Sequence, residues 1–372
     1  MRILVDYRAA LRARTGVGEY IHELVRAYCA AFDDEMTLFS SSWKDRPDPG
    51  MASAIGARLV DRRIPVRVLN LLWHRAEWPP AETLAGAVDV THSAHPLLLP
   101  ARHAAQVITI HDLFFLDQPD RTRGEIRRDY PALAASHARR ADAIVTSTEH
   151  ARQLVSRSFD VAPDRIYVCP PGPPQWRTLG HLPNVPRDGH ILFVGTLEPR
   201  KNVGALLDAY EMLLARRPAA PPLVLAGRAT PDAAEWLRRL TSAPLAAHAS
   251  HLGYVPDEAQ EALYAGARVL VLPSLDEGFG LPALAAMSAG VPVIASRRGA
   301  LPEVVGSGGI LIDPERPGEL ADALERIIGD DQWAFSQGAA GLARARAFSW
   351  PIAAATLRRA YLDAIARRRA RT

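Results

Sequence analysis

The sequence predicts an α/β protein built from two Rossmann-like, doubly wound domains. The chain has 372 residues, which is too long for one ordinary core and suits two domains of roughly 150–190 residues each. Short apolar runs rich in β-branched residues alternate with alanine-rich stretches of helical pattern, as expected for parallel strands covered by helices on both faces. A proline-rich segment near the middle of the chain separates two such alternating halves.

The predicted strands are the continuous apolar runs. Right-handed crossovers between such strands give doubly wound sheets, in which ligands bind at the carboxyl ends of the strands. The first half contains the predicted strands Ile3–Asp6, Thr37–Phe39, Val88–His92, Val107–His111, Ala143–Thr146 and Ile166–Val168. The second half contains the predicted strands Ile191–Val194, Leu223–Ala226, Val269–Leu272 and Val291–Ala295.

Proline placement predicts the domain boundaries. The run Pro170–Pro174 opens a stretch without strong periodicity, where the proline density excludes a helix or a strand. We therefore predict a first domain over residues 1–170, a linker over 171–189 and a second domain over 190–348. Residues 349–372 follow as a final helix with Pro351 in its first turn.

Composition narrows the class of protein. The sequence has no run of about 20 apolar residues that would cross a membrane. The apolar run at its N-terminus is too short for a signal peptide and is interrupted early by the acidic residue Asp6. The two cysteines, Cys29 and Cys169, lie far apart and form no ligand cluster, which fits a reduced, cytoplasmic location. The net charge is only +3, and nucleic acid is not an expected partner.

The most informative stretch is Leu-Asp-Glu-Gly-Phe-Gly-Leu-Pro at 275–282. Gly278 and Gly280 allow a backbone to approach a ligand without a Cβ in the way. Pro282 suits the first turn of a helix over Ala283–Ala289. The N-terminus of that helix is expected to direct free N–H groups and its positive dipole end at an anion.

A second stretch, Gly-Thr-Leu-Glu-Pro-Arg-Lys-Asn at 195–202, follows a predicted strand. Arg200 and Lys201 stand at the exit of that strand, where a phosphate ligand would lie. Arginine offers a planar fork of donors and lysine a compact point charge, and fixed cations stabilise negative charge that develops in a transition state. The alternative is a solvated pair of loop residues.

Both stretches resemble motifs of glycosyltransferase family 4, whose members are retaining enzymes of GT-B fold. The second stretch is similar to the diphosphate loop of the family. The first continues to Ala295 and matches the pattern E-G-F-G-L-P-x-L-E-A-M-A-x-G-x-P-V-I-A at nearly every position. The resemblance covers nearly the whole chain. It implies two Rossmann-like domains facing a central cleft, with the acceptor on the first, the nucleotide-sugar donor on the second, and the last helix crossing back to the first.

The resemblance implies roles for residues of the second domain. Glu277 is expected to accept hydrogen bonds from hydroxyls of the donor sugar, and Arg200 and Lys201 to stabilise the diphosphate, as catalytic residues. The other donor-binding residues that it implies lie in loops after strands or on the helix that follows 275–282. They are Thr196, Gly227, Arg228, Gly253, Tyr254, Val255, Gly278, Phe279, Gly280, Leu281 and Ala285. For Gly227 and Gly253 a plain turn is the alternative.

Ala285 departs from the family pattern, which has there a second glutamate that holds the ribose diol. Charge-assisted hydrogen bonds of that kind contribute about 1.5–3 kcal/mol, so their loss is expected to weaken nucleotide binding roughly tenfold to a hundredfold. Three explanations compete: the phosphates and base hold the donor, another side chain reaches the ribose, or the protein is a weakened or inactive relative. We favour the first two together, because every other donor element is present.

The first domain supplies further candidates. Thr-Gly-Val-Gly-Glu-Tyr at 15–20 resembles the G-[IV]-G-x-Y loop of the family, in which Gly16 and Gly18 let the donor phosphate or the acceptor come close. His111 and Asp112 end a predicted strand. By resemblance His111 is catalytic, because it binds the donor sugar and supports developing oxocarbenium charge. Asp112 orients the ring, caps the following segment or touches the acceptor. Three arginines, Arg8, Arg12 and Arg14, lie on the same approach. They either attract phosphate or are simply solvated.

The resemblance predicts a retaining hexosyltransferase with a nucleoside-diphosphate sugar as co-substrate, and GDP-mannose is the first choice of donor. No cofactor and no metal are predicted, because the sequence shows neither a D-x-D pair at the donor site nor His/Cys ligand spacing. The main alternative is a non-catalytic GT-B relative that binds a sugar or a partner. A third option, a phosphorylase, is disfavoured because no lysine for pyridoxal phosphate is identifiable.

The expected acceptor is a glycan or a lipid-linked saccharide of surface polysaccharide or glycolipid biosynthesis. The protein would then be cytoplasmic, with peripheral contact at the inner face of the plasma membrane. The segment Val66–Trp78 is either an amphipathic interfacial helix or a core helix of the first domain. The C-terminal arginines are either a solvated helix end or a site for anionic headgroups or a pyrophosphate-linked acceptor. They are Arg358, Arg359, Arg367, Arg368, Arg369 and Arg371.

Overall fold

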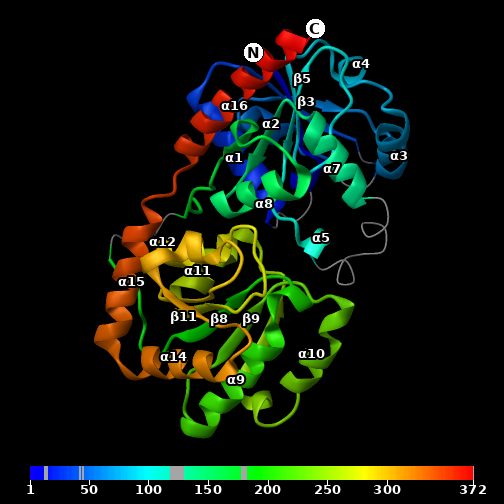
Figure 1. Cartoon of the computed structure of the whole chain (residues 1–372). Coiled ribbons are helices and arrows are strands. Elements are labelled where there is room, and N and C mark those ends of the chain that lie inside the picture. Colours follow the sequence, from blue (N-terminus) through cyan, green and yellow to red (C-terminus); the bar gives the residue numbers. More distant parts are fainter. Residues whose placement is uncertain (12–15, 42, 44–45, 118–129, 177–181, 372) are drawn as a thin grey trace. The chain divides into compact units, whose positions relative to one another are not determined.

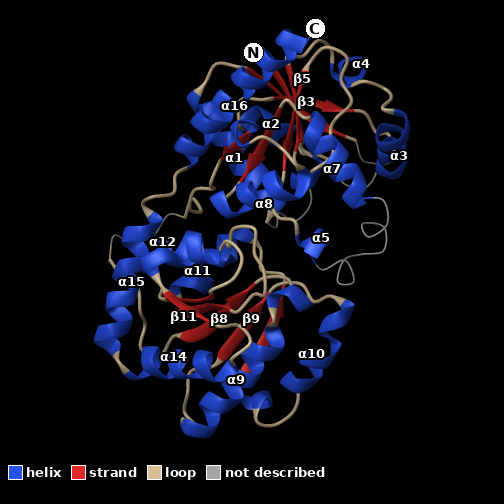
Figure 2. Ribbon diagram, viewed as in Figure 1, coloured by secondary structure: helices blue, strands red, loops and turns tan. Residues whose placement is uncertain are grey.

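The computed structural model describes residues 1–11, 16–41, 43, 46–117, 130–176 and 182–371. The chain forms two compact units (Figure 1). The first unit comprises Met1–Gly172 and Ser349–Thr372, and the second comprises Pro173–Phe348. Each unit contains one parallel sheet with helices packed over it (Figure 2), which confirms the predicted α/β class.

The sheet of the first unit has seven parallel strands in the order β3-β2-β1-β4-β5-β6-β7. The order reverses between β1 and β4, and in open parallel sheets ligands bind outside the carboxyl ends of the strands at such a point. The strands are β1 (Arg2–Asp6), β2 (Glu35–Ser40), β3 (Arg58–Asp61), β4 (Val90–Ser93), β5 (Ala105–Thr109), β6 (Ala143–Thr146) and β7 (Ile166–Val168).

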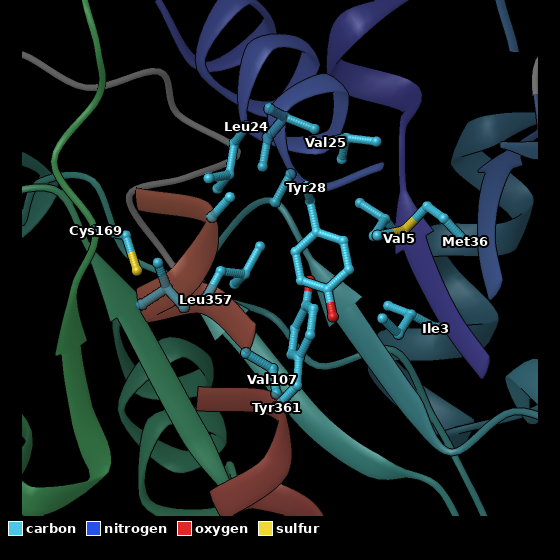
Figure 3. Packing of buried hydrophobic residues seen from close by; sticks show 14 of the residues in the cluster. Ile3, Val5, Leu24, Val25, Tyr28, Met36, Val107, Cys169, Leu357 and Tyr361 are labelled. Atoms are coloured by element: carbon cyan, nitrogen blue, oxygen red, sulfur yellow. The ribbon is translucent and has the colours of Figure 1, made fainter. Parts of the chain in front are cut away.

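Helices cover both faces of this sheet because successive strand residues point to opposite sides. On one face, Ile3 and Val5 of β1 pack with Tyr28 and Tyr361 (Figure 3). On the other face, Leu4 packs under α3 and α4. The helices of this unit are η1 (Arg8–Ala10), α1 (Val17–Ala31), α2 (Pro49–Ala54), α3 (Val66–Ala76), α4 (Ala81–Ala85), α5 (Phe114–Asp117), α7 (Tyr130–Arg140), α8 (Glu149–Phe159), η3 (Pro163–Arg165) and α16 (Trp350–Arg371).

The final helix, α16, is an integral part of the first unit although it follows the second unit in sequence. Its apolar face joins α1 in one core cluster. A buried histidine of β4 also ties it to the sheet: His92 Nδ1 shares a hydrogen bond with the hydroxyl of Tyr361 at 2.7 Å, and His92 Nε2 shares one with Thr109 Oγ1 at 2.8 Å.

The C-terminal arginines of α16 mostly bind the first unit itself. Arg371 Nη1 donates to Asp142 Oδ1 at 3.0 Å, and Arg367 Nη2 donates to the carbonyl of Asp164 at 2.8 Å. Asp142 immediately precedes β6 and Asp164 lies just before β7. These arginines therefore lie at the amino ends of the strands, whereas ligands of parallel sheets bind at the carboxyl ends.

The sheet of the second unit has six parallel strands in the order β10-β9-β8-β11-β12-β13, and the order reverses between β8 and β11. The strands are β8 (His190–Val194), β9 (Leu223–Ala226), β10 (Ala249–Gly253), β11 (Ala267–Leu272), β12 (Val293–Ser296) and β13 (Ile310–Ile312). The helices are η4 (Pro199–Lys201), α9 (Val203–Arg216), η5 (Pro231–Ala233), α10 (Ala234–Leu240), η6 (Leu245–Ala247), α11 (Asp257–Ala265), α12 (Leu281–Ser288), α13 (Leu301–Val305), η7 (Gly306–Gly308), α14 (Pro317–Gly329) and α15 (Asp331–Ala345).

All ten predicted strands exist, with ends that differ by up to two residues, but the sequence analysis missed β3, β10 and β13. All three are edge strands. Few of their residues are buried: Val60 in β3, Ile312 in β13 and none in β10. A strand without buried faces on both sides lacks the continuous apolar run by which the others were identified.

Candidate active site

The carboxyl edge of the second sheet brings two of the predicted catalytic side chains together. Lys201 ends η4, which follows β8, and Glu277 lies in the loop after β11. Because β8 and β11 are hydrogen-bonded neighbours, the two loops meet although 76 residues separate them in sequence. Lys201 Nζ donates to Glu277 Oε1 at 2.5 Å, and both side chains are buried. The edge thus contains a buried ion pair.

The surroundings of Glu277 keep it ionised. Burial alone would raise its pKa, because desolvation disfavours the charged form, but Lys201 and Arg200 outweigh burial and lower the pKa below its ordinary value. Arg200 Nη1 lies 3.5 Å from Glu277 Oε2, and Ser274 Oγ donates to Glu277 Oε1 at 2.8 Å. Arg200 Nη2 also pairs with Glu198 Oε1 at 3.1 Å. Two cations and a hydroxyl therefore fix one carboxylate at the edge of the sheet.

The backbone around Glu277 is fixed as tightly as its side chain. Ala300 N donates to the carbonyl of Glu277 at 3.0 Å. Gly299 has φ +61°, and a Cβ there would lie 2.7 Å from Glu277 N. Only glycine tolerates both conditions. The loop after β12 thereby braces the loop that carries the carboxylate.

Asn202 connects three loops of the same edge. It adopts a left-handed backbone with φ 53° directly after Lys201. Its Nδ2 donates to the carbonyl of Pro273 at 3.2 Å and to the carbonyl of Pro314 at 2.7 Å. The loops that follow β8, β11 and β13 are therefore joined by one side chain, which positions Lys201.

Three glycines at the ends of β8, β9 and β10 bring those loops together backbone to backbone. Gly227 has φ +142°, and a Cβ there would lie 1.9 Å from the carbonyl oxygen of Gly195. Gly227 N also donates to the carbonyl of Gly253 at 2.7 Å, while His251 Nε2 hydrogen-bonds to the carbonyl of Gly227 at 2.7 Å. Close backbone approach therefore requires glycine at 227, beyond the needs of a plain turn.

The predicted donor-binding side chains of these loops lie next to one another. The guanidinium of Arg228 stands over the ring of Tyr254 at 5.1 Å from its centroid. Arg228 is exposed, and Tyr254 and Val255 are half-buried. Thr196, also half-buried, precedes Leu197, whose N–H donates to the carbonyl of Arg228 at 2.8 Å. The loops that carry these residues are therefore in contact at the carboxyl edge.

Helix α12 begins at the same edge. Its N-cap is Gly280 with φ +95°, where a Cβ would lie 2.6 Å from the Leu301 side chain, so glycine is required. Leu281 is the first helical residue, and Gly278 precedes the cap in a half-buried position. The buried Phe279 packs edge-on against another ring 5.5 Å away. The positive end of the helix dipole is thus fixed beside the Lys201 loop.

Ala285 lies one turn into α12 and is 7% exposed. Its carbonyl accepts a hydrogen bond from Ser288 Oγ at 2.8 Å. The methyl side chain belongs to the apolar cluster under the helix. At this position a buried methyl group stands where the family pattern has a carboxylate.

In the first unit, His111 lies two residues beyond β5. Burial lowers the pKa of His111 to about 4, so the ring is neutral at neutral pH. The ring hydrogen-bonds to the carbonyl of Ala94, whereas its Nε2 is buried and has no hydrogen-bond partner within the described residues. A neutral ring that donates from its other nitrogen presents Nε2 as an acceptor, which suits a hydroxyl group. Asp112 Oδ1 accepts from Phe114 N at 3.3 Å, a cap of the following segment.

The first turn of α1 supports His111 from the side. Tyr20 packs edge-on against the His111 ring with centroids 5.1 Å apart, and its hydroxyl donates to the carbonyl of Cys169 at 2.8 Å. Gly18 is buried, and a Cβ there would lie 2.5 Å from the carbonyl oxygen of Ala9, so it allows α1 to pack on η1. Gly16 is the exposed N-cap of α1, with φ +40°.

Arg8 is neither solvated nor available for phosphate, because it is bound internally. Its Nε and Nη2 donate to the two carboxylate oxygens of the buried Asp6 at 2.8 and 2.6 Å, and its Nη1 donates to Asn70 Oδ1 at 2.8 Å. His95 Nε2 lies 3.5 Å from Asp6 Oδ2. The group stands where β1 and β4 end, at the reversal of strand order. Arg12 and Arg14 lie outside the described residues.

The predicted site residues therefore fall into two groups, one in each unit. Lys201, Arg200 and Glu277 are in contact, and the donor-binding residues line the same edge of the second sheet. The sequence analysis gave no role to Ser274, Asn202 or Gly299, which hold this group in place. Ser274 stands two residues after a predicted strand and Asn202 ends the Arg-Lys motif, but a position at a strand exit is the only signal that the sequence offers for them, and many small polar residues share it.

Comparison with known proteins identifies the family of this chain. The model of the family described as Glycosyltransferase Family 4 matches residues 14–173, and the model described as Glycosyl transferases group 1 matches residues 188–330. O-antigen chain mannosyltransferase B of Escherichia coli is 33% identical over 362 residues, which cover 90% of this chain and 93% of that protein. A D-inositol 3-phosphate glycosyltransferase of Corynebacterium glutamicum is 30% identical over 289 residues, covering 72% of this chain and 68% of that protein.

Among solved structures, sucrose-phosphate synthase from Thermosynechococcus elongatus has a TM-score of 0.76 at 21% identity, covering 96% of this chain and 97% of that one. Two Rossmann-like parallel sheets together with this likeness define the fold as GT-B. The chain belongs to glycosyltransferase family 4 and is a glycosyltransferase.

Proposed function

We propose that this glycosyltransferase is a retaining enzyme that moves mannose from GDP-mannose to an acceptor hydroxyl. The observation that carries the proposal is the buried Lys201–Glu277 pair, with Arg200 beside it, at the reversal of strand order in the second sheet. The choice of mannose is supported by the likeness to O-antigen chain mannosyltransferase B over 90% of this chain.

The donor diphosphate binds at Arg200, Lys201 and the N-terminus of α12. Free N–H groups and the positive dipole end of the helix favour an anion there. Glu277 is ionised and can accept hydrogen bonds only, so it recognises hydroxyl groups of the sugar. Arg228, Tyr254 and the backbone of 253–255 face the nucleoside.

The reaction forms one glycosidic bond and breaks one bond to phosphate. The acceptor oxygen attacks the anomeric carbon on the face from which the diphosphate leaves, the bond between that carbon and the phosphate oxygen breaks, and the acceptor proton passes to the departing phosphate. Negative charge develops on the leaving diphosphate, and Lys201 and Arg200 stabilise it as preorganised cations. His111, neutral and with Nε2 as an acceptor, binds a hydroxyl of the transferred sugar.

No metal or other cofactor is part of this proposal. Two side-chain cations and a helix N-terminus supply the positive charge that a divalent ion supplies to the diphosphate in other enzymes. Within the described residues no group of three or more His, Cys, Asp or Glu side chains has the arrangement of a metal site.

The acceptor is a glycan or lipid-linked saccharide of surface polysaccharide or glycolipid biosynthesis, and the enzyme works in the cytoplasm with peripheral contact at the membrane. None of the described helices is both long and apolar enough to span a bilayer. Membrane contact would therefore come from the surface of the folded chain.

Titration calorimetry of the purified protein with GDP, UDP and ADP and their common sugars tests the donor. Preferential binding of GDP and GDP-mannose, followed by transfer with retention of the anomeric configuration in an NMR assay, is the expected result. Preference for another nucleotide would replace the donor, and inversion of configuration would refute the mechanism.

One observation favours a second candidate function, a non-catalytic relative that binds a sugar or a partner protein. Ala285 has a buried methyl group where the family has the ribose-binding glutamate. If folded protein binds none of the nucleotides, this second function replaces the first. Nucleotide binding with turnover eliminates it.

A further inference from the structure

The outer surface of α3 is apolar although it faces solvent. Val68 and Leu71 of α3 are 48% and 62% exposed, and Trp78, two residues beyond the helix, is 58% exposed. At the other end, Trp43 is 73% exposed and its indole N–H donates to the carbonyl of Arg63, three residues before the helix begins. We refer to Trp43, Val68, Leu71 and Trp78 as the α3 surface.

The fold does not need these side chains, because α3 is anchored through its opposite face. Leu69 and Trp73 are buried, and Trp73 Nε1 donates to the carbonyl of Pro79 at 3.0 Å. Asn70 accepts from Arg8 at 2.8 Å. The apolar residues of the outer face therefore add exposed area without adding to the core of the first unit. Val68 and Leu71, three residues apart, are neighbours on the helix surface, and contiguous apolar exposure in a folded protein points to an interaction site.

The charges around the α3 surface are cationic. Arg67, Leu71 and Arg75 follow one another at intervals of four and so share one face of the helix. Arg63 precedes it. The nearest acidic residues are already paired, Asp61 with Arg46 at 2.9 Å and Glu77 with Arg140 at 2.5 Å. Apolar and aromatic side chains with arginines beside them match the interface of a bilayer that contains anionic lipid.

We propose that the α3 surface docks the protein on a membrane rich in anionic phospholipid. Tryptophan at both ends of the helix suits the headgroup level of a bilayer, and the arginines complement its negative surface. This inference locates the peripheral membrane contact of the proposed function. The biological reason for docking rests on the proposed function, whereas the docking surface itself is argued from the exposed residues. The inner face of the same helix contacts Arg8 at the carboxyl ends of β1 and β4, so docking would bring a lipid-linked acceptor next to that edge.

Co-sedimentation of the full chain with vesicles tests the proposal. Vesicles of phosphatidylcholine alone are compared with vesicles that also contain phosphatidylglycerol. We expect binding to the anionic vesicles that weakens at raised salt, because screening acts on exposed charges. Arg63→Gln with Arg67→Gln is expected to weaken this binding at least about tenfold. Val68→Gln with Leu71→Gln and Trp78→Gln is expected to weaken it by a similar factor.

Matched controls remove the same kinds of groups elsewhere. Phe335→Gln with Ile352→Gln removes side chains that are 52% and 59% exposed, and Arg238→Gln with Arg346→Gln removes two exposed arginines. Both controls are expected to bind anionic vesicles like the original protein. Circular dichroism melts of all variants identify any that fail to fold.

Three outcomes would overturn the proposal. The original protein fails to bind the anionic vesicles, or the α3 variants bind as well as their controls, or sedimentation velocity shows a dimer that only the α3 variants lose, which makes a second copy the partner. Transfer to a water-soluble acceptor is measured in parallel. If the α3 variants lose vesicle binding but still transfer sugar to the soluble acceptor, the docking surface is supported separately from the catalytic activity. If neither the original protein nor any variant transfers sugar, the proposed function fails.

Discussion

In the first unit, Arg8 and Asp6 form a closed ion pair at the reversal of strand order. Beyond β5 the same edge carries His111, a buried neutral ring whose Nε2 can accept a hydrogen bond. In the second unit, the corresponding edge is lined by Lys201, Arg200 and the ionised Glu277. Both sheets share the same order over their first six strands. The strand order therefore decides where a ligand binds in each unit, and the side chains of the following loops decide what charge that ligand carries.

The largest expected effect comes from breaking the charged edge of the second unit. Removing one partner of a buried ion pair leaves an uncompensated charge and costs about 3–5 kcal/mol. We expect Glu277→Ala and Lys201→Ala each to destabilise the protein by that amount and to lower turnover at least about a hundredfold, as when an electrostatic contact in the transition state is lost. Denaturant unfolding and an assay of kcat measure the two effects. Near-normal rates in both variants would refute the site assignment.

Acid should break the first unit before the second. Burial lowers the pKa of His111 to about 4 and that of His92 to about 3. Between pH 6.5 and these values the unfolded chain binds more protons than the folded chain, so the stability from burying the neutral rings is lost as the pH falls below 6.5. At pH 5 the loss is roughly 2 kcal/mol for each ring.

For Glu277 the folded pKa is lowered instead, so the stability that it contributes is present above its ordinary pKa of 4.5 and is lost only below that. The second unit also contains His190, with a lowered pKa. In the first unit burial lowers the pKa of His74 and His137 as well as that of His92 and His111. Hydrogen exchange at pH 7 and pH 5 measures each unit. Equal loss of protection in both would contradict the comparison.

A smaller effect tests the backbone contacts of the second edge. Gly227→Ala adds a Cβ 1.9 Å from the carbonyl oxygen of Gly195 and is expected to cost about 2 kcal/mol by backbone strain and to weaken nucleotide binding. Gly318→Ala is the control, because a Cβ there meets nothing within 4 Å. Thermal unfolding and calorimetry measure both. Equal behaviour of the two variants would mean that the loops relax freely.

The smallest effect concerns Ala285. We expect Ala285→Glu to tighten nucleoside-diphosphate binding about tenfold, since a carboxylate at the ribose adds charge-assisted hydrogen bonds. We also expect it to lower stability, because the Ala285 methyl lies in an apolar cluster. Titration with GDP measures the change. Unchanged or weaker affinity would show that another group already holds the ribose.

The fold could be predicted where strands are buried on both faces. Residues such as those of β11 form an uninterrupted apolar run, whereas β10 at the edge of the sheet contains Ser250 and His251 and gives no such signal. A run of apolar residues in the sequence indicates a strand that is buried on both faces. Edge strands are less buried and therefore lack such a run.

The candidate site could be predicted as separate residues but not as an arrangement. Family motifs identified Lys201 and Glu277, yet their contact depends on the pairing of β8 with β11, which no local pattern states. Ser274 and Asn202 act through hydrogen bonds to other loops, and small polar residues at strand exits are too common to single out. Arg8 illustrates the converse, because its binding to Asp6 and Asn70 removes it from the phosphate ligands that its position suggested.

The position of α16 in the first unit affects the order of folding during synthesis. Its side chains complete the core around Tyr28 and Tyr361, so this core stays open until residues of the C-terminal helix have left the ribosome. The second unit ends at Phe348, so all of its residues are synthesised before those of α16. Nascent chains usually fold from the N-terminal domain onward, but here the second unit is the first whose sequence is complete.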